Sequence, residues 1–108
     1  MVLAKPKIDK SRNDPNPHVV QGRPFTLWCP ASGHPFPTVK WFKNGVLVDP
    51  SKHRDQWRLL DKGQGLEIMS AKTSDKGVWT CIAENDAGTT EEEINLDVWG
   101  MLTVFSLK

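Results

Sequence analysis

Two cysteines and three histidines are the residues of this 108-residue chain whose side chains could carry chemistry. A thiol can act as a nucleophile, bind a metal or form a disulfide, and an imidazole can act as a base or a metal ligand. His18, His34 and His53 fall in three separate loops, with no acidic or cysteine neighbour at the spacing of metal ligands. We therefore expect surface histidines, no metal site and no cofactor.

Other catalytic patterns are also missing from the sequence. No serine lies on a strained turn of the nucleophile-elbow type, and Gly63 and Gly65 flank a hairpin turn instead of opening a phosphate-binding helix. The three glutamates at 91–93 form a charge run, which on an edge strand is typical of a solvated face that resists aggregation. The sequence therefore predicts a protein that is not an enzyme.

Length and composition narrow the class of protein further. The chain is long enough for one domain, and 38% hydrophobic and 25% charged residues are typical of a globular one. A net charge of +1 argues against nucleic-acid binding. No apolar run approaches the roughly 20 residues of a membrane helix, and the opening residues lack an apolar core of signal-peptide length. We expect an intracellular protein or a fragment of a larger secreted one.

Eight prolines and eight glycines divide the chain into short alternating segments, which favours an all-β fold. In the segment "RPFTLWCPA", for example, Leu27 and Cys29 share one face while Trp28 lies on the other. Asn44-Gly45 is a strong hairpin signal. Roughly eight strands are predicted, at 18–20, 23–31, 38–43, 46–48, 57–60, 65–71, 77–85 and 89–98, with loops at 32–38 and 49–56.

Strands spaced about ten residues apart predict a sandwich of two antiparallel sheets with Greek-key connections. Residues 1–5 are expected to be a linker, 6–98 the domain, and 99–108 an apolar tail. The alternation places Cys29, Cys81 and Trp41 on inward faces. This spacing predicts a disulfide between the sheets with the indole packed on it, and the alternative is two unpaired buried thiols in a reducing cell.

The motifs around both cysteines resemble the immunoglobulin superfamily. "DKGVWTCIAENDAG" is similar to the family pattern D-x-G-x-Y-x-C-x-A-x-N-x-x-G, and "LWCPASGHPFPTVKWFKNG" resembles the first half of the intermediate set. "GLEIMSAKTSD" is similar to the family's fifth strand. Together these motifs cover about residues 6–98. The resemblance implies an immunoglobulin-like sandwich with a Cys29–Cys81 disulfide and a core containing Trp41, Trp79, Leu27, Leu66, Ile68 and Asp75.

Within the intermediate set, the chain looks most like the extracellular repeats of the hemicentin type. That resemblance implies a non-catalytic protein–protein interaction module of a multidomain adhesion or matrix protein, located outside the cell. Its partners would be neighbouring immunoglobulin-type modules or matrix components. Two alternatives stay open, namely an intracellular sarcomeric module of the titin kind and a receptor ectodomain that binds a soluble ligand.

One position departs from the family pattern. Trp79 stands where the family has a tyrosine whose hydroxyl bonds back to the preceding corner of the chain. We expect Trp79 to be buried, with its indole N–H donating to a backbone carbonyl. The family also pairs the carboxylate at Asp75 with a basic residue, and Arg54 and Arg58 are the candidates here.

Outward-facing apolar side chains are the candidate binding surface, because aromatic residues are enriched at interface hot spots. The alternation predicts Phe42 and Ile82 as cross-strand neighbours on one sheet, and Trp28 beside Met69 on the other. The tail "WGMLTVFSLK" is apolar and β-prone. A homodimer could therefore form through this tail or through an exposed sheet face.

Overall fold

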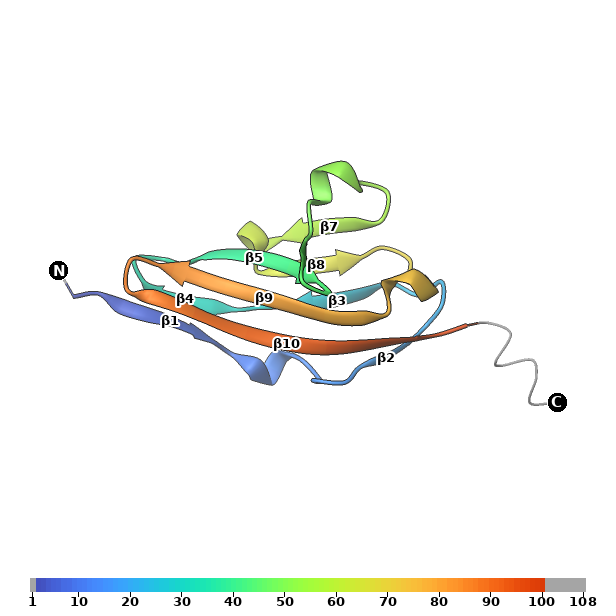
Figure 1. Cartoon of the computed structure of the whole chain (residues 1–108), viewed down its shortest axis with the longest axis horizontal. Coiled ribbons are helices and arrows are strands. Elements are labelled where there is room, and N and C mark those ends of the chain that lie inside the picture. The colour runs from blue at the N-terminus through green and yellow to red at the C-terminus, as the bar shows by residue number, and fades with distance from the viewer. Residues whose placement is uncertain (1, 101–108) are drawn as a thin grey trace.

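The computed structural model describes residues 2–100 as a β-sandwich (Figure 1). Its strands are β1 (Ala4–Ile8), β2 (His18–Val20), β3 (Phe25–Trp28), β4 (Ala31–His34), β5 (Thr38–Lys43), β6 (Val46–Leu47), β7 (Trp57–Leu60), β8 (Gly65–Ile68), β9 (Gly77–Asn85) and β10 (Gly88–Trp99). Four short 3-10 helices connect them, namely η1 (Lys10–Arg12), η2 (Pro50–Lys52), η3 (Asp61–Gly63) and η4 (Thr73–Asp75).

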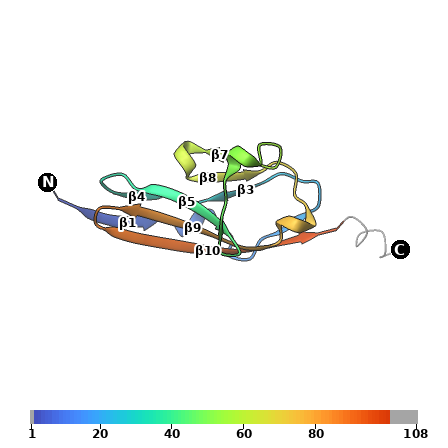
Figure 2. The same cartoon turned by 45° about the horizontal axis from the view of Figure 1, so that its top comes forward.

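The strands form two layers, which Figure 2 shows from a second angle. One layer is the five-stranded sheet β2-β10-β9-β5-β6. The other contains β3-β8-β7 and the pair β1-β4. Because β4 follows β3 after only two residues, β3 and β4 act as one interrupted strand of that layer. The prediction of an all-β immunoglobulin-like sandwich is confirmed.

The interruption between β3 and β4 falls at Cys29-Pro30 and raises the strand count above the eight predicted. Pro30 has no N–H to donate to a sheet. The backbone N–H of Cys29 donates to the carbonyl of Gln64 at 2.6 Å, and the Gln64 side chain donates to the Ala31 carbonyl at 3.1 Å. These two bonds tie the broken strand to the turn before β8. The predicted loop at 32–38 was therefore too long, since β4 reaches His34.

The start of the chain is the second difference from the expected sandwich. The first strand begins at Ala4, inside the segment predicted to be a linker, and pairs with β4. The chain then crosses to the other layer, where β2 pairs in parallel with β10. This is the one parallel pair among the described strands, which otherwise pair antiparallel as predicted, because the crossing at residues 9–17 does not reverse the direction of the chain.

Inward-facing side chains from both layers fill the core. Leu27, Leu66, Ile68, Trp79 and Ile94 are fully buried. The Asn44-Gly45 turn joins β5 to β6 with φ values of 49° and 82°, as its hairpin signal predicts. Strand β10 runs to Trp99, the first residue of the predicted tail, and residues 101–108 of that tail lie outside the described residues.

Candidate functional site

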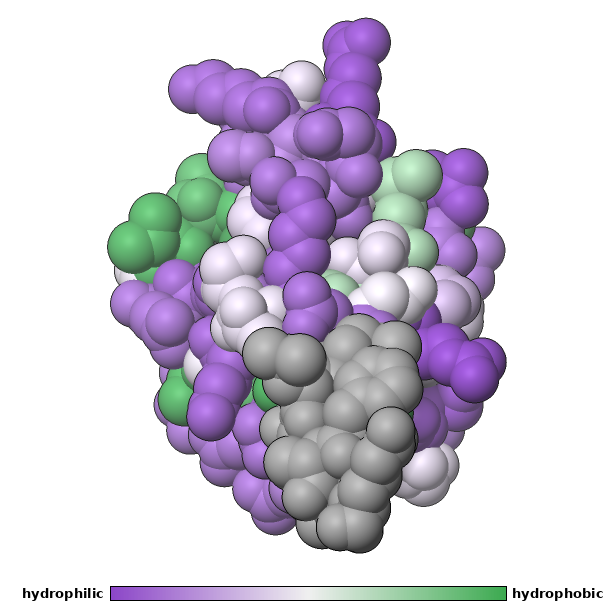
Figure 3. All heavy atoms as spheres, turned by 90° about the vertical axis from the view of Figure 1, so that its right-hand side faces the viewer, coloured by the Kyte–Doolittle hydropathy of each residue, from purple (hydrophilic) through white to green (hydrophobic). Residues whose placement is uncertain are grey.

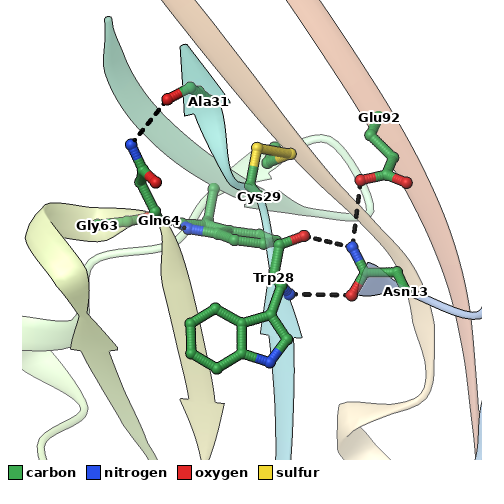
Figure 4. The surroundings of a disulfide bond; sticks show 9 residues. Asn13, Trp28, Cys29, Ala31, Gly63, Gln64 and Glu92 are labelled. Carbon is green, nitrogen blue, oxygen red and sulfur yellow. Dashed lines mark hydrogen bonds between the residues drawn. A yellow bond between two sulfur atoms is a disulfide. The ribbon is translucent and has the colours of Figure 1, made fainter. Parts of the chain in front are cut away.

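The two cysteines form a disulfide that joins the two layers (Figure 4). Both are fully buried, Cys29 after the end of β3 and Cys81 in the middle of β9. Trp41 lies opposite Cys81 in the β5–β9 register, and its Nε1 donates to the Gly63 carbonyl at 2.7 Å. The predicted disulfide is confirmed, and neither sulfur remains a free thiol for nucleophilic or metal chemistry.

Trp79 fills the corner between η4 and β9. Its side chain has no exposed surface, and its Nε1 donates to the Asp75 carbonyl at 2.8 Å. The ring of Trp57 meets it edge-on, with centroids 5.5 Å apart and planes at 88°. The corner is thus held by one N–H bond and an edge-to-face pair of indoles.

The Asp75 carboxylate has a different partner from the one predicted. Its Oδ1 accepts from Nε1 of Trp57 at 3.2 Å, and its Oδ2 accepts from the Lys72 backbone N–H at 2.8 Å. Arg58 instead forms an ion pair with Glu67 across the β7–β8 register. The prediction of an arginine partner is wrong, because an indole N–H occupies the site and the Arg58 side chain lies on the outer face of its strand.

Asn13 connects the crossing segment to both layers, as Figure 4 shows. Its Oδ1 accepts from the backbone N–H of Trp28 at 3.0 Å, and its Nδ2 donates to the Trp28 carbonyl. The same Nδ2 donates to Oε1 of Glu92 in β10 at 3.2 Å. The sequence analysis assigned no role to Asn13, since nothing in its spacing indicates that the chain crosses between layers there.

Glu92 is the one member of the glutamate run that faces the interior. It lies opposite Cys81 in the β9–β10 register and is 8% exposed, whereas Glu91 and Glu93 are exposed. Burial raises the pKa of its carboxyl, against the lowering effects of the Asn13 hydrogen bond and of the Lys10 charge. The prediction of a solvated charge run is therefore wrong for the middle residue.

The outer face of the five-stranded sheet carries Phe42 and Ile82, both half-buried. In the register Phe42 lies opposite Thr80 and Ile82 lies opposite Lys40, so the two apolar side chains are diagonal neighbours. They are cross-strand neighbours, as predicted, in the diagonal arrangement, with Lys40 and Thr80 beside them. They still share one face with Glu91 and Glu93, which lie opposite Ile82 and Thr80 on β10.

Trp28 and Met69 are not adjacent, contrary to the prediction. Trp28 lies opposite Gly65 and Phe25 lies opposite Ile68, so Met69 is at the far end of the β3–β8 pair. A Cβ on Gly65 would approach the Trp28 ring to 2.8 Å, so the absence of a side chain there makes room for the indole. Met69 lines an open hollow beside β7 together with Trp57 and Leu59.

Within residues 2–100 no three His, Cys, Asp or Glu side chains gather as a metal-ion site would require. The described residues also contain no helix with the length and hydrophobicity to cross a membrane. The ring of His18 is tilted by 34° to that of Trp99, and its Nδ1 lies 3.4 Å from Oδ2 of Asp97. The ring of His53 is tilted by 55° to that of Trp57, with centroids 4.8 Å apart.

A family model described as "Immunoglobulin domain" matches residues 5–85. The chain is an immunoglobulin domain. It is 38% identical to hemicentin-1 of Mus musculus over 101 residues, which are 91% of this chain but 2% of that protein. It is 31% identical to neural cell adhesion molecule 1 of Homo sapiens over 92% of this chain and 12% of that one. The chain thus spans a small fraction of the relatives it matches.

A solved structure of titin domain M7 superposes with a TM-score of 0.77 at 27% identity, covering 91% of this chain and 97% of that one. Against the family pattern, this immunoglobulin domain has two tryptophans at its corner. Trp79 replaces the tyrosine, and Trp57 takes the place of the basic partner of Asp75. The indole N–H of Trp79 donates in place of the tyrosine hydroxyl, and the indole N–H of Trp57 donates in place of the basic side chain.

Replacing Glu92 by Gln is expected to stabilise the domain at neutral pH. A carboxyl with a raised native pKa binds its proton more tightly in the folded state, so folding becomes more favourable as the pH falls from above that pKa toward the ordinary value of 4.5. An uncharged amide removes this dependence and can still accept from Asn13. Urea unfolding across this pH range should therefore give a lower free energy of unfolding for wild type than for Glu92→Gln. This difference should shrink as the pH falls.

The matched control is Glu91→Gln, which makes the same change on the exposed side of the same strand. The free energy of unfolding of this control should differ little from that of wild type, and the difference should be nearly independent of pH. Other carboxyls also make stability depend on pH, such as Asp9, whose pKa the Ser11 hydroxyl lowers. Their contribution is the same in every variant and cancels when the variants are compared. A Glu92→Gln variant that is less stable than wild type at pH 7 would contradict the cost of burying this charge.

Proposed function

We propose that this immunoglobulin domain is a non-catalytic protein-recognition module of a longer adhesion or matrix protein, located outside the cell. The observation that carries the proposal is the match in length, since 91% of the chain corresponds to 2% of hemicentin-1. A unit of this size within so long a protein is consistent with one link in an array. Its partners would be neighbouring immunoglobulin-type modules or matrix components.

The buried disulfide supports an extracellular location. Disulfides persist in oxidising compartments and are rare in the reducing cytosol. The Cys29–Cys81 bond joins the two layers at the centre of the core, and both cysteines are fully buried. The similarity to a protein named neural cell adhesion molecule 1 also supports an adhesion role.

A second candidate function is an intracellular filament module. It is favoured by the superposition on titin domain M7, which covers 97% of that structure. A third candidate function is that of a receptor ectodomain that binds a soluble ligand, which would use the outer faces of the sandwich. The oxidation state of the cysteines separates the filament candidate from the other two.

Thiol labelling of the natural protein tests the location. Denatured, unreduced material should show no reaction of Cys29 or Cys81 with an alkylating reagent, and both should react after reduction. The mass of the peptides that contain the two cysteines reports each outcome. Quantitative labelling without reduction would contradict the extracellular proposal and favour the titin-like candidate.

A further inference from the structure

We propose that two copies of this domain associate face to back, the acidic outer face of one five-stranded sheet docking on the basic outer face of the other layer. The inference rests on the proposed protein-recognition function and names its partner, a second copy of this chain. Such a contact would join parallel arrays side by side. The two surfaces that carry it lie on opposite sides of the sandwich.

The acidic face consists of Glu84, Glu91 and Glu93 around the apolar pair Phe42 and Ile82. All three glutamates are exposed, and none lies within 4.0 Å of a basic group among the ion pairs of residues 2–100. Glu91 flanks the apolar pair directly, because it lies opposite Ile82. Glu93 lies opposite Thr80, which separates it from Phe42. The face therefore combines an apolar centre with unpaired negative charge.

One cation interrupts the acidic face. Lys40 lies opposite Ile82 on the side away from Glu91 and is exposed. A row across β5, β9 and β10 therefore consists of the cation Lys40, the apolar Ile82 and the anion Glu91. A partner surface would have to offer the reverse order of charges around an apolar group.

The basic face consists of Lys7, Arg12 and Arg58 around Trp28. The guanidinium of Arg12 lies 4.5 Å above the centre of the half-buried Trp28 ring. Lys7 is exposed on β1 and lies opposite Ser32, and Arg58 is 60% exposed where it pairs with Glu67. Glu67 and the exposed Asp9, whose carboxylate interacts with the Arg12 charge, supply the anions of this face, and Lys40 supplies the cation of the other.

The two faces are complementary in charge and in composition. Each has a half-buried apolar centre and charges mainly of one sign around it. The chain as a whole carries only +1, so the separation of charge lies between its two sides and does not reflect a net excess. Because the contact joins different surfaces, it is heterologous, and repetition produces a row of domains and not a closed dimer.

The end of the sandwich where β10 finishes offers less for such a contact (Figure 3). Figure 3 shows hydrophilic residues over most of the end from which the C-terminal segment leaves, with hydrophobic residues mainly at its sides. Electrostatic complementarity chiefly sets the orientation and the rate of association, and it is screened by salt. The contact should therefore be weak at high ionic strength and selective in its geometry.

Sedimentation velocity over a range of protein concentrations tests the proposal. Wild-type protein at low salt should show a sedimentation coefficient that rises with concentration, and added salt should suppress the rise. Glu91→Lys on the acidic face and Lys7→Glu on the basic face should each weaken self-association by about tenfold. The controls Asp55→Lys and Lys52→Glu change the same charges at exposed positions off both faces and should stay within about twofold of wild type.

An equimolar mixture of Glu91→Lys and Lys7→Glu is the decisive measurement, because it restores complementary pairs of faces. The unchanged acidic face of Lys7→Glu can dock on the unchanged basic face of Glu91→Lys, and the two reversed faces are complementary to each other. The mixture should associate more strongly than either variant alone. A wild-type coefficient that does not depend on concentration overturns the inference but leaves the proposed recognition of other proteins standing. Loss of association in Glu91→Lys alone, with Lys7→Glu unaffected, overturns the face-to-back arrangement.

Phe42→Ser tests the apolar centre of the acidic face without touching charge. Phe42 is half-buried on the outer side of β5, so thermal unfolding should show a domain that still folds cooperatively. Self-association should fall by about tenfold, as expected for truncating an interface aromatic. Unchanged association of the folded variant would contradict a role for this face.

Discussion

Removing the Cys29–Cys81 disulfide is expected to lower the free energy of unfolding by about 4 kcal/mol. The bond links residues 52 positions apart, and in the chain-entropy model a loop of that length restricts the unfolded chain by about this amount. Since domains of this size unfold with about 5–15 kcal/mol, the loss is a large fraction of the total. Urea unfolding of the Cys29→Ala, Cys81→Ala double variant should show a much lower midpoint.

Reduction of the wild-type protein distinguishes the contribution of the crosslink to stability from that of the packing of the two sulfur atoms. A reducing agent opens the bond but keeps both side chains in the core, whereas the double variant also leaves cavities beside Trp41. We expect the reduced wild type to lie between the oxidised protein and the double variant. Equal stability of the oxidised and reduced forms would contradict the assignment of the disulfide as the main covalent constraint on the fold.

Much of the sandwich could be predicted from alternation alone, because a strand with one buried face shows its orientation in every second residue. Leu66 and Ile68 alternate with Glu67, and their inward positions follow from that pattern. Alternation does not report which residues lie opposite each other. That Phe42 and Ile82 are diagonal neighbours, and not directly opposite each other, is known only from the β5–β9 register of the structure.

The first quarter of the chain was harder to predict for a physical reason. Its strands β1 and β2 are short and lie in different layers, and the polar segment between them reads as a linker. The roles of Asn13 and Glu92 depend on contacts between residues 79 positions apart, which no local pattern encodes. Only the fold brings the Asn13 amide, the Trp28 backbone and the Glu92 carboxyl together.

The partner of Asp75 shows a different limit of sequence reasoning. An arginine nearby in the sequence was a reasonable donor, but the side chain that reaches the carboxylate is set by which face of β7 points inward. Trp57 lies opposite the buried Ile68 and so faces the core, whereas Arg58 lies opposite Glu67 and faces out. A tryptophan can satisfy the carboxylate there because its one N–H lies at the edge of an otherwise apolar ring.

The second large effect is expected at Trp79. Replacing it by Phe should cost about 2 to 3 kcal/mol in the free energy of unfolding, because the change removes the hydrogen bond to the Asp75 carbonyl and leaves a cavity in a fully buried site. Trp57→Phe should cost only about 1 kcal/mol, since that ring is partly exposed and its bond to Asp75 is longer, at 3.2 Å. Chemical denaturation of the two variants gives both values.

The double variant and a tyrosine substitution show whether the corner acts as a unit. The two indoles are in contact at 5.5 Å, so the cost of changing both should differ from the sum of the single costs by about 0.5 kcal/mol or more. Trp79→Tyr offers the hydroxyl that the family uses, but Asp75 here also accepts from Trp57, and the space fits a larger ring. We expect Trp79→Tyr to be less stable than wild type. A variant at least as stable as wild type would show that the indole is not matched to this corner.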